Sequence, residues 1–191
     1  KQITAEVCIH HLWFTNEDYD TKGNLIKWNP AVKTANDRKE LWEALLDDRI
    51  DVIATDHAPH TLEEKQQSYL KAPSGGPLVQ HAVVAMFEAH HQGKISVEKI
   101  VEKMAHNPAK IFKIQKRGFI KKGFYADLAI VNPNLTWTVK KENVLSKCGW
   151  SPFEDFTFKS IIPHTCVNGQ LVYENLKVKN IHCGKRLLFD R

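Results

Sequence analysis

The residues best suited to chemistry lie in one short stretch, Ala54–His60, which contains one aspartate and two histidines. The stretch follows the run Asp51–Ile53, and this order is typical of a short buried strand with polar groups at its C-terminal end. In a barrel of parallel strands, the catalytic groups lie at that end. Carboxylates and imidazoles bind metal ions and move protons, so the stretch predicts a metal-dependent hydrolase.

Asp56 is the strongest single candidate in this stretch. We expect its apolar strand to desolvate it, and a buried carboxylate is costly unless a cation or hydrogen bonds compensate. A metal ion would compensate, and an aspartate that merely caps the next turn is the alternative. We favour the metal because His57, Pro59 and His60 accompany Asp56. Pro59 restricts the turn, so His60 is expected to point back over the barrel mouth.

Three other features invite a functional interpretation but are weaker alone. His10 and His11 end another predicted strand, where neighbours face opposite ways, so we expect one packed and one exposed histidine and no shared ion. Asn29-Pro30 is by itself a turn signal. The segment Ala72–Gly76 precedes a predicted helix and offers backbone N–H groups that suit a carboxylate or ring carbonyl.

The elements that must position these groups alternate between strand and helix, which indicates an α/β fold with parallel strands. We expect strands at Ile3–Ile9 and Ile50–Thr55, polar loops at Asn16–Asn24 and His57–Gly76, and helices over 36–48, 77–91 and 96–104, with a further short one from Asn107.

The pattern changes after Gly118. Ala126–Val131 has the composition of a strand, and Cys166–Tyr173 predicts a hairpin with Asn168-Gly169 as its two-residue turn. We therefore expect two regions, an α/β region at 1–117 and a small β module with a tail at 118–191.

Composition excludes several classes of protein. The 191 residues carry a net charge of +5, but the lysines are scattered, which indicates solvated faces and no nucleic-acid partner. No apolar stretch approaches the roughly 20 residues of a membrane span. The four cysteines are far apart without a CxxC spacing, which favours reduced thiols in a cytoplasmic protein over a zinc knuckle or redox pair.

Taken together, the motifs resemble those of the dihydroorotases, a family of the amidohydrolase superfamily. The resemblance spans essentially the whole chain, although the family usually has Thr-Pro where Cys8-Ile9 stand here. The matching segments are Ala54–Lys65, Ala72–Gly75, Glu6–Leu12, Asn29-Pro30, Asn107–Phe112, Gly118–Pro133 and Ser151–Phe153.

For the fold, the resemblance implies the C-terminal portion of a metal-dependent (β/α)8 TIM-barrel amidohydrolase plus a small β-sandwich module. The family's His-x-His pair, bridging acidic ligand and two further histidines do not occur in this chain, which is expected to start at the seventh barrel strand. For the site, the resemblance implies that Asp56 is a zinc ligand and the general acid/base. Asn29, His60, Ser74 and Gly75 would hold the substrate, and the complete enzyme would carry one or two zinc ions.

The implied reaction is the reversible hydrolysis of the cyclic amide of dihydroorotate to carbamoyl aspartate, with this piece inactive alone. The partner is then a small-molecule substrate, with no nucleic acid and no membrane, and a homodimer is allowed. Two alternatives stay open: another cyclic amidase, such as dihydropyrimidinase or allantoinase, and a non-catalytic scaffold that binds a protein such as a transcarbamoylase. We favour an enzyme over the scaffold because Asp56 and His60 are both present.

Overall fold

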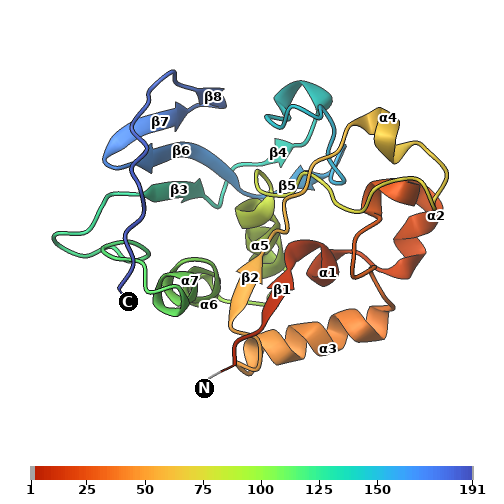
Figure 1. The fold of residues 1–191 in the computed structure, drawn as a ribbon, viewed down its shortest axis with the longest axis horizontal. Coiled ribbons are helices and arrows are strands. Elements are labelled where there is room, and N and C mark those ends of the chain that lie inside the picture. Colours follow the sequence, from red (N-terminus) through yellow and green to blue (C-terminus); the bar gives the residue numbers. More distant parts are fainter. Residues whose placement is uncertain (1–2, 191) are drawn as a thin grey trace. The chain divides into compact units, whose positions relative to one another are not determined.

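Figure 1 shows the computed structural model of the chain, which describes residues 3–190. The chain forms two compact units. The first comprises residues up to Met86 together with Thr138–Phe158, and the second comprises Phe87–Trp137 together with residues from Lys159 onward. This division differs from a single boundary at Gly118, because residues 87–117 belong to the second unit and residues 138–158 to the first.

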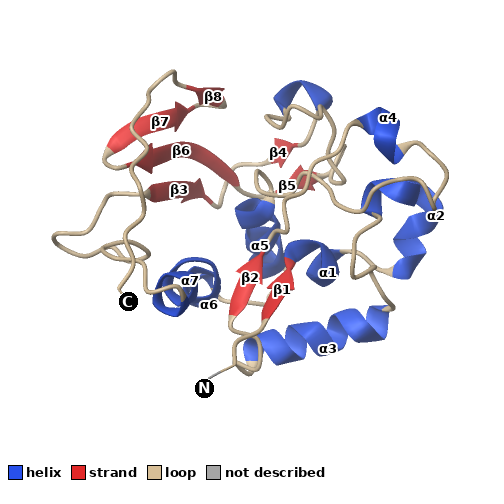
Figure 2. Cartoon of the chain, in the orientation of Figure 1, coloured by secondary structure: helices blue, strands red, loops and turns tan. Residues whose placement is uncertain are grey.

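The centre of the first unit is a pair of parallel strands, β1 (Glu6–Cys8) and β2 (Val52–Ala54), which lie side by side in Figure 2. Val7 pairs with Ile53, and both side chains are buried. The strands lie where the apolar pattern predicts them, but both are shorter than expected. A helix begins directly after Cys8, which ends β1 early.

Helical segments make up much of the remainder of this unit. They are α1 (Ile9–Trp13), η1 (Asn16–Asp18), α2 (Tyr19–Lys22), η2 (Gly23–Ile26), α3 (Ala35–Leu46), α4 (Leu62–Lys65) and the first half of α5 (Ala82–His91). The expectation of a loop at Asn16–Asn24 is therefore wrong. The predicted helix near residue 36 is confirmed as α3, but its N-cap is Thr34, whose hydroxyl accepts from the Asp37 N–H.

The expected structureless loop at His57–Gly76 contains the short helix α4. Its start is a capping box: the Thr61 hydroxyl accepts from the Glu64 N–H, and the Glu64 carboxylate accepts from the Thr61 N–H. The pairing satisfies donors at the helix start that would otherwise lack partners. It also fixes the direction in which the chain leaves the residues before Thr61.

An aromatic cluster ties residues 138–158 into the first unit. The Trp13 ring meets the rings of Phe153 and Phe156 edge to face, with centroids 5.1 and 5.0 Å apart. This segment also contains η4 (Lys141–Asn143) and β5 (Thr157–Phe158), which pairs with β4 (Trp137–Thr138). Edge-to-face contacts add to the stabilisation from burial alone.

The second unit combines a helical run with an antiparallel sheet. The run is α6 (Val97–Val101), the π-helical segment η3 (Glu102–His106) and α7 (Asn107–Ile111). The sheet has the strand order β3 (Leu128–Asn132), β6 (Ile161–Val167), β7 (Gln170–Glu174) and β8 (Lys177–Val178). The predicted hairpin is confirmed, since Asn168 and Gly169 both have positive φ angles, 49° and 80°, between β6 and β7.

The region expected to be a β-sandwich contains, within the described residues 3–190, a four-stranded sheet, β3-β6-β7-β8, and a separate pair, β4-β5. These strands do not by themselves confirm a sandwich. All four cysteines are free thiols, as the spacing predicts. Over the same residues, every helix is too short or too polar to cross a membrane.

Candidate active site

Asp56 lies two residues beyond the end of β2, where the chain turns through a left-handed conformation with φ of 46°. Its side chain is exposed in this chain, so the expected desolvation of Asp56 is wrong. The reason is local, because the buried part of the strand ends at Ile53, three residues before Asp56. Since β1 and β2 are parallel, their carboxyl ends share one edge, which also carries the residues after Cys8.

His57 joins the two ends of the following loop. Its Nδ1 accepts from the backbone N–H groups of Leu78 and Val79, at 3.0 and 3.2 Å, so the ring proton is on Nε2. The neighbouring Ala58 N–H donates to the Gly76 carbonyl at 3.2 Å. His57 thus has a positioning role that the sequence pattern did not indicate.

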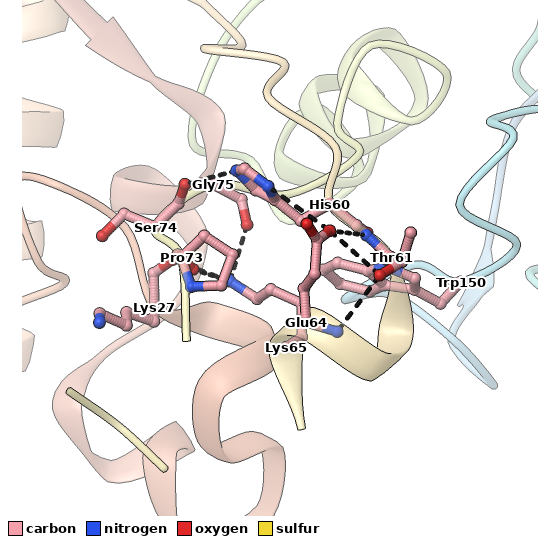
Figure 3. Close-up of polar contacts among 9 residues, drawn as sticks. All are labelled: Lys27, His60, Thr61, Glu64, Lys65, Pro73, Ser74, Gly75 and Trp150. Carbon is pink, nitrogen blue, oxygen red and sulfur yellow. Dashed lines mark hydrogen bonds and ion pairs between the residues drawn. The ribbon is translucent and has the colours of Figure 1, made fainter. Parts of the chain in front are cut away.

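His60 and Ser74, both predicted to bind substrate, are in direct contact (Figure 3). The Nε2–H of His60 donates to the Ser74 carbonyl at 3.0 Å. The His60 carbonyl in turn accepts from the indole N–H of Trp150 at 2.7 Å. The His60 side chain is 31% exposed, so one ring nitrogen is held by the protein while part of the ring remains accessible.

Gly75 is buried and has φ of 121°, a conformation that favours glycine. Its N–H donates to the Lys27 carbonyl at 2.9 Å, so the expectation of a free N–H at this residue is wrong. Asn29, two residues beyond Lys27, is exposed. The structure therefore links the Ser74–Gly75 segment to the chain just before Asn29 through the backbone.

An open hollow of about 470 Å³ lies beside His60 in the first unit. It is lined by His57, Pro59, His60, Thr61, Glu64, Ser146, Lys147 and Cys148. A hollow of this size falls within the range of small-molecule sites. Residues 146–148 were not expected at the site, because nothing in their composition connects them with a segment some ninety residues earlier.

Cys8, His10 and His11 come together, with one potential ligand atom of each lying within 4.8 Å of the others. The argument that adjacent histidines must face apart is wrong here, because α1 replaces the expected strand end. His10 is buried and stacks on Trp28 with centroids 4.3 Å apart, while the His11 Nε2–H donates to the Pro30 carbonyl. Burial raises the pKa of the Cys8 thiol to about 12, aided by the nearby carboxylates, so the thiol is protonated.

The two buried histidines, His10 and His81, are expected to make the protein less stable in acid. Burial lowers the pKa of His10 to about 3 and of His81 to about 4, below the ordinary value of 6.5. Both rings are neutral in the folded protein, and unfolding lets them take up protons below pH 6.5. We therefore expect the free energy of unfolding to fall by about 1.4 kcal/mol per histidine for each pH unit between pH 6.5 and about pH 4.

The test is urea unfolding at pH 7 and pH 5. His10→Phe, which keeps a ring against Trp28, should remove about half of this acid sensitivity. His182→Phe is the control, because His182 is exposed. An equal loss of stability in the unmodified protein and in His10→Phe would contradict the assignment of a neutral buried His10.

Comparison with known proteins gives the chain's family. The sequence profile of the amidohydrolase family matches residues 4–172. The chain belongs to the amidohydrolase family. This amidohydrolase is 37% identical to the dihydroorotase of Pyrococcus furiosus over 188 residues, which cover 98% of this chain and 44% of that protein. It is 40% identical to the dihydroorotase of Carboxydothermus hydrogenoformans over 179 residues, which cover 92% of this chain and 41% of the other.

The structural comparison supports the same fold. The L-hydantoinase (dihydropyrimidinase) of Arthrobacter aurescens superimposes with a TM-score of 0.87 at 28% identity, covering 92% of this chain and 40% of the hydantoinase. The α/β assignment to part of an amidohydrolase TIM barrel is thereby confirmed. The amidohydrolase chain spans less than half the length of the relatives it matches.

One buried residue that contacts the Pro73–Gly75 segment was missed because its helix was missed. Lys65 ends α4 and is among the largest fully buried side chains of the described residues. A Thr-x-x-Glu pattern at Thr61 to Glu64 is a capping-box signal and would have predicted the helix. Nothing in the pattern would have predicted that the lysine at its end is buried.

Proposed function

We propose that the protein containing these 191 residues is a zinc-dependent dihydroorotase, which reversibly hydrolyses the cyclic amide of dihydroorotate to carbamoyl aspartate. The observation that carries the proposal is the 37–40% identity to several dihydroorotases across nearly the whole chain. The contact between His60 and Ser74 adds geometric support, because it joins residues that the resemblance assigns to one substrate.

The donor chemistry at Asp56 fits a zinc ion in part. A carboxylate oxygen is an accepted zinc ligand, and a catalytic site needs about three protein ligands. Within residues 3–190, no group of three histidine, cysteine, aspartate or glutamate donors includes Asp56. The remaining ligands, for one or two ions, are therefore proposed to lie outside these residues.

When bound, zinc would polarise the amide carbonyl and make water a better nucleophile near neutral pH. Asp56 would accept the proton of the attacking water and pass it to the leaving ring nitrogen as the amide C–N bond breaks. His60, the Ser74–Gly75 segment and Asn29 would hold the substrate so that its amide faces Asp56. The accessible part of the His60 ring and the adjoining hollow leave room for a small cyclic amide to bind.

The deciding experiment is a hydrolysis assay of the whole protein with dihydroorotate, dihydrouracil and hydantoin in parallel. We expect kcat/KM to be highest for dihydroorotate. A preference for hydantoin or dihydrouracil would favour a general cyclic amidase instead, a candidate supported by the TM-score of 0.87 to a hydantoinase. Absence of hydrolysis with all three compounds would favour the non-catalytic scaffold.

The proposal also covers the domain organisation, the cellular location and the oligomeric state of the protein. Residues 1–117 are proposed to supply the last barrel strands, and residues 118–191 a β module in which the β3-β6-β7-β8 sheet is one layer of a sandwich. The protein is proposed to act in the cytoplasm, which suits its four free thiols. A homodimer is proposed on the family resemblance alone, and gel filtration of the whole protein would test it.

Replacing His60 by alanine tests the division of roles at the site. In the whole enzyme, His60→Ala should raise KM and lower turnover, because it removes both a substrate contact and the bond that holds Ser74. Zinc content should be unchanged, and the exposed His182→Ala should behave like the unmodified enzyme. Loss of metal with intact substrate affinity would show that His60 is a ligand.

A further inference from the structure

The Lys65 side chain is only 1% exposed, which is unusual for a lysine. A buried ammonium is costly unless hydrogen bonds replace its hydration. Burial lowers the pKa of Lys65 to about 8, and the nearby Lys27 charge adds to the shift. The groups that contact Lys65 must therefore compensate for the burial of its ammonium.

Those neighbours are three backbone carbonyls, shown in Figure 3. Lys65 Nζ donates to Gly75 O at 2.8 Å, to Pro73 O at 3.0 Å and to Lys27 O at 3.2 Å. An ammonium has three N–H donors, so each donor has an acceptor. Because all three acceptors are backbone atoms, the bonds fix the path of the chain.

The path that they fix is the proposed substrate-binding segment. The carbonyls of Pro73 and Gly75 accept from Lys65, and the Ser74 carbonyl between them accepts from His60. Three consecutive carbonyls are thus held by side chains from residues 60–65. The Lys27 carbonyl accepts from both Lys65 and the Gly75 N–H, which ties in the chain two residues before Asn29.

A second lysine holds the earlier part of the same loop. Lys27 Nζ donates to the carbonyls of Tyr69 and Ala72, and it lies 4.6 Å from the centroid of the Tyr69 ring. The loop from Tyr69 to Gly75 therefore turns four of its carbonyls toward two ammonium groups. These hydrogen bonds hold the loop in place without any contact from a substrate.

We propose that Lys65 is a positioning residue for substrate binding. Its ammonium holds the Ser74–Gly75 segment, to which His60 donates, and the chain leading to Asn29 at a fixed spacing before substrate arrives. Preorganisation of this kind lowers the cost of binding. The inference rests on the proposed function for the identity of the substrate, but not for the anchoring of the loop.

The test replaces Lys65 by methionine, which has a similar shape but no charge and no donors. In the whole enzyme, Lys65→Met should raise KM for dihydroorotate at least tenfold and leave kcat within about threefold, since Lys65 is not at the reacting bond. Amide hydrogen exchange of peptides covering 66–76, measured without substrate, should increase at least tenfold. Lys65→Arg, which keeps the charge, should recover part of both effects.

Two control variants separate positioning from simple loss of stability. Lys71→Met removes an exposed lysine from the same loop and should change neither KM nor exchange. Leu45→Ala empties a buried site in α3 and should lower the melting temperature without changing KM. If Lys65→Met does not fold, Lys65→Gln replaces it. Its amide has no charge and only two donors, so KM and exchange should still rise but by less than tenfold, and no change in either would contradict the proposal.

A folded Lys65→Met enzyme with unchanged KM and unchanged exchange at 66–76 would overturn the proposal. So would a rise in KM matched by Leu45→Ala. Failure of the unmodified enzyme to hydrolyse any cyclic amide would instead overturn the proposed function. The exchange measurement needs no substrate, so it would still decide whether Lys65 anchors the loop.

Discussion

Asp56→Asn is expected to lower the turnover of the whole enzyme at least about a hundredfold, the lower end of general acid/base contributions. Asparagine has nearly the same size but cannot accept a proton, and its amide is a poorer metal ligand. Steady-state kinetics with dihydroorotate, together with metal analysis of the purified variant, would measure both roles. Asp56 lies outside the buried strand and is exposed, so the substitution should leave the fold intact.

The matched control is Asp51→Asn, which changes an aspartate before β2 instead of after it. It can affect stability, because the Asp51 carboxylate accepts from the Ala5 N–H at 2.8 Å, but it should leave kcat within about threefold. Near-normal turnover of Asp56→Asn with metal retained would remove Asp56 from the mechanism.

Gly75→Ala is expected to have the largest effect on structure. A Cβ at this residue would lie 2.5 Å from the Ala58 carbonyl oxygen and 2.8 Å from the Ala58 Cβ, and the φ of 121° is unfavourable for alanine. Strained backbone and overpacking each cost about 1–3 kcal/mol, so we expect about 2–6 kcal/mol of destabilisation. Relief of the clash would move the loop away from Ala58 and raise KM.

Denaturant unfolding of Gly75→Ala beside Gly93→Ala would separate the two costs. Gly93 also has a positive φ, 73°, but a Cβ there would meet nothing within 4 Å. The control should therefore lose only the roughly 1–2 kcal/mol of the backbone term. Equal losses in the two variants would show that contact with Ala58 does not constrain Gly75.

The parts of the fold that the sequence predicted are those with strong local signals. Asn168-Gly169 can adopt the two positive φ angles that a tight hairpin requires, and the β-branched residues Val52 and Ile53 suit a buried strand. The helical turns between Asn16 and Ile26 were missed because segments of three or four residues are too short to show a helical period.

The assignment of the candidate site rests on residue types and stays a prediction, whereas its supporting contacts could not be predicted from the sequence. Asp56 and His60 lie in a distinctive motif, whereas the burial of Lys65 depends on the carbonyl of Lys27, 38 residues earlier. Lysine is ordinarily exposed, so composition argues against its burial. The relative orientation of the His10 and His11 side chains was also predicted wrongly. It depends on whether the chain after Cys8 continues as a strand or becomes a helix, which the local sequence does not decide.

The hydrogen bond from Trp150 to the His60 carbonyl joins residues 90 positions apart in the sequence. The segment 138–158 is therefore part of the structure that supports the site, although it lies well after β2, the strand that Asp56 and His60 follow. A hybrid enzyme made by joining two relatives between residues 91 and 137 would pair His60 with a foreign partner at position 150. Exchange of substrate preference between such relatives therefore requires 54–76 and 138–158 to be transferred together.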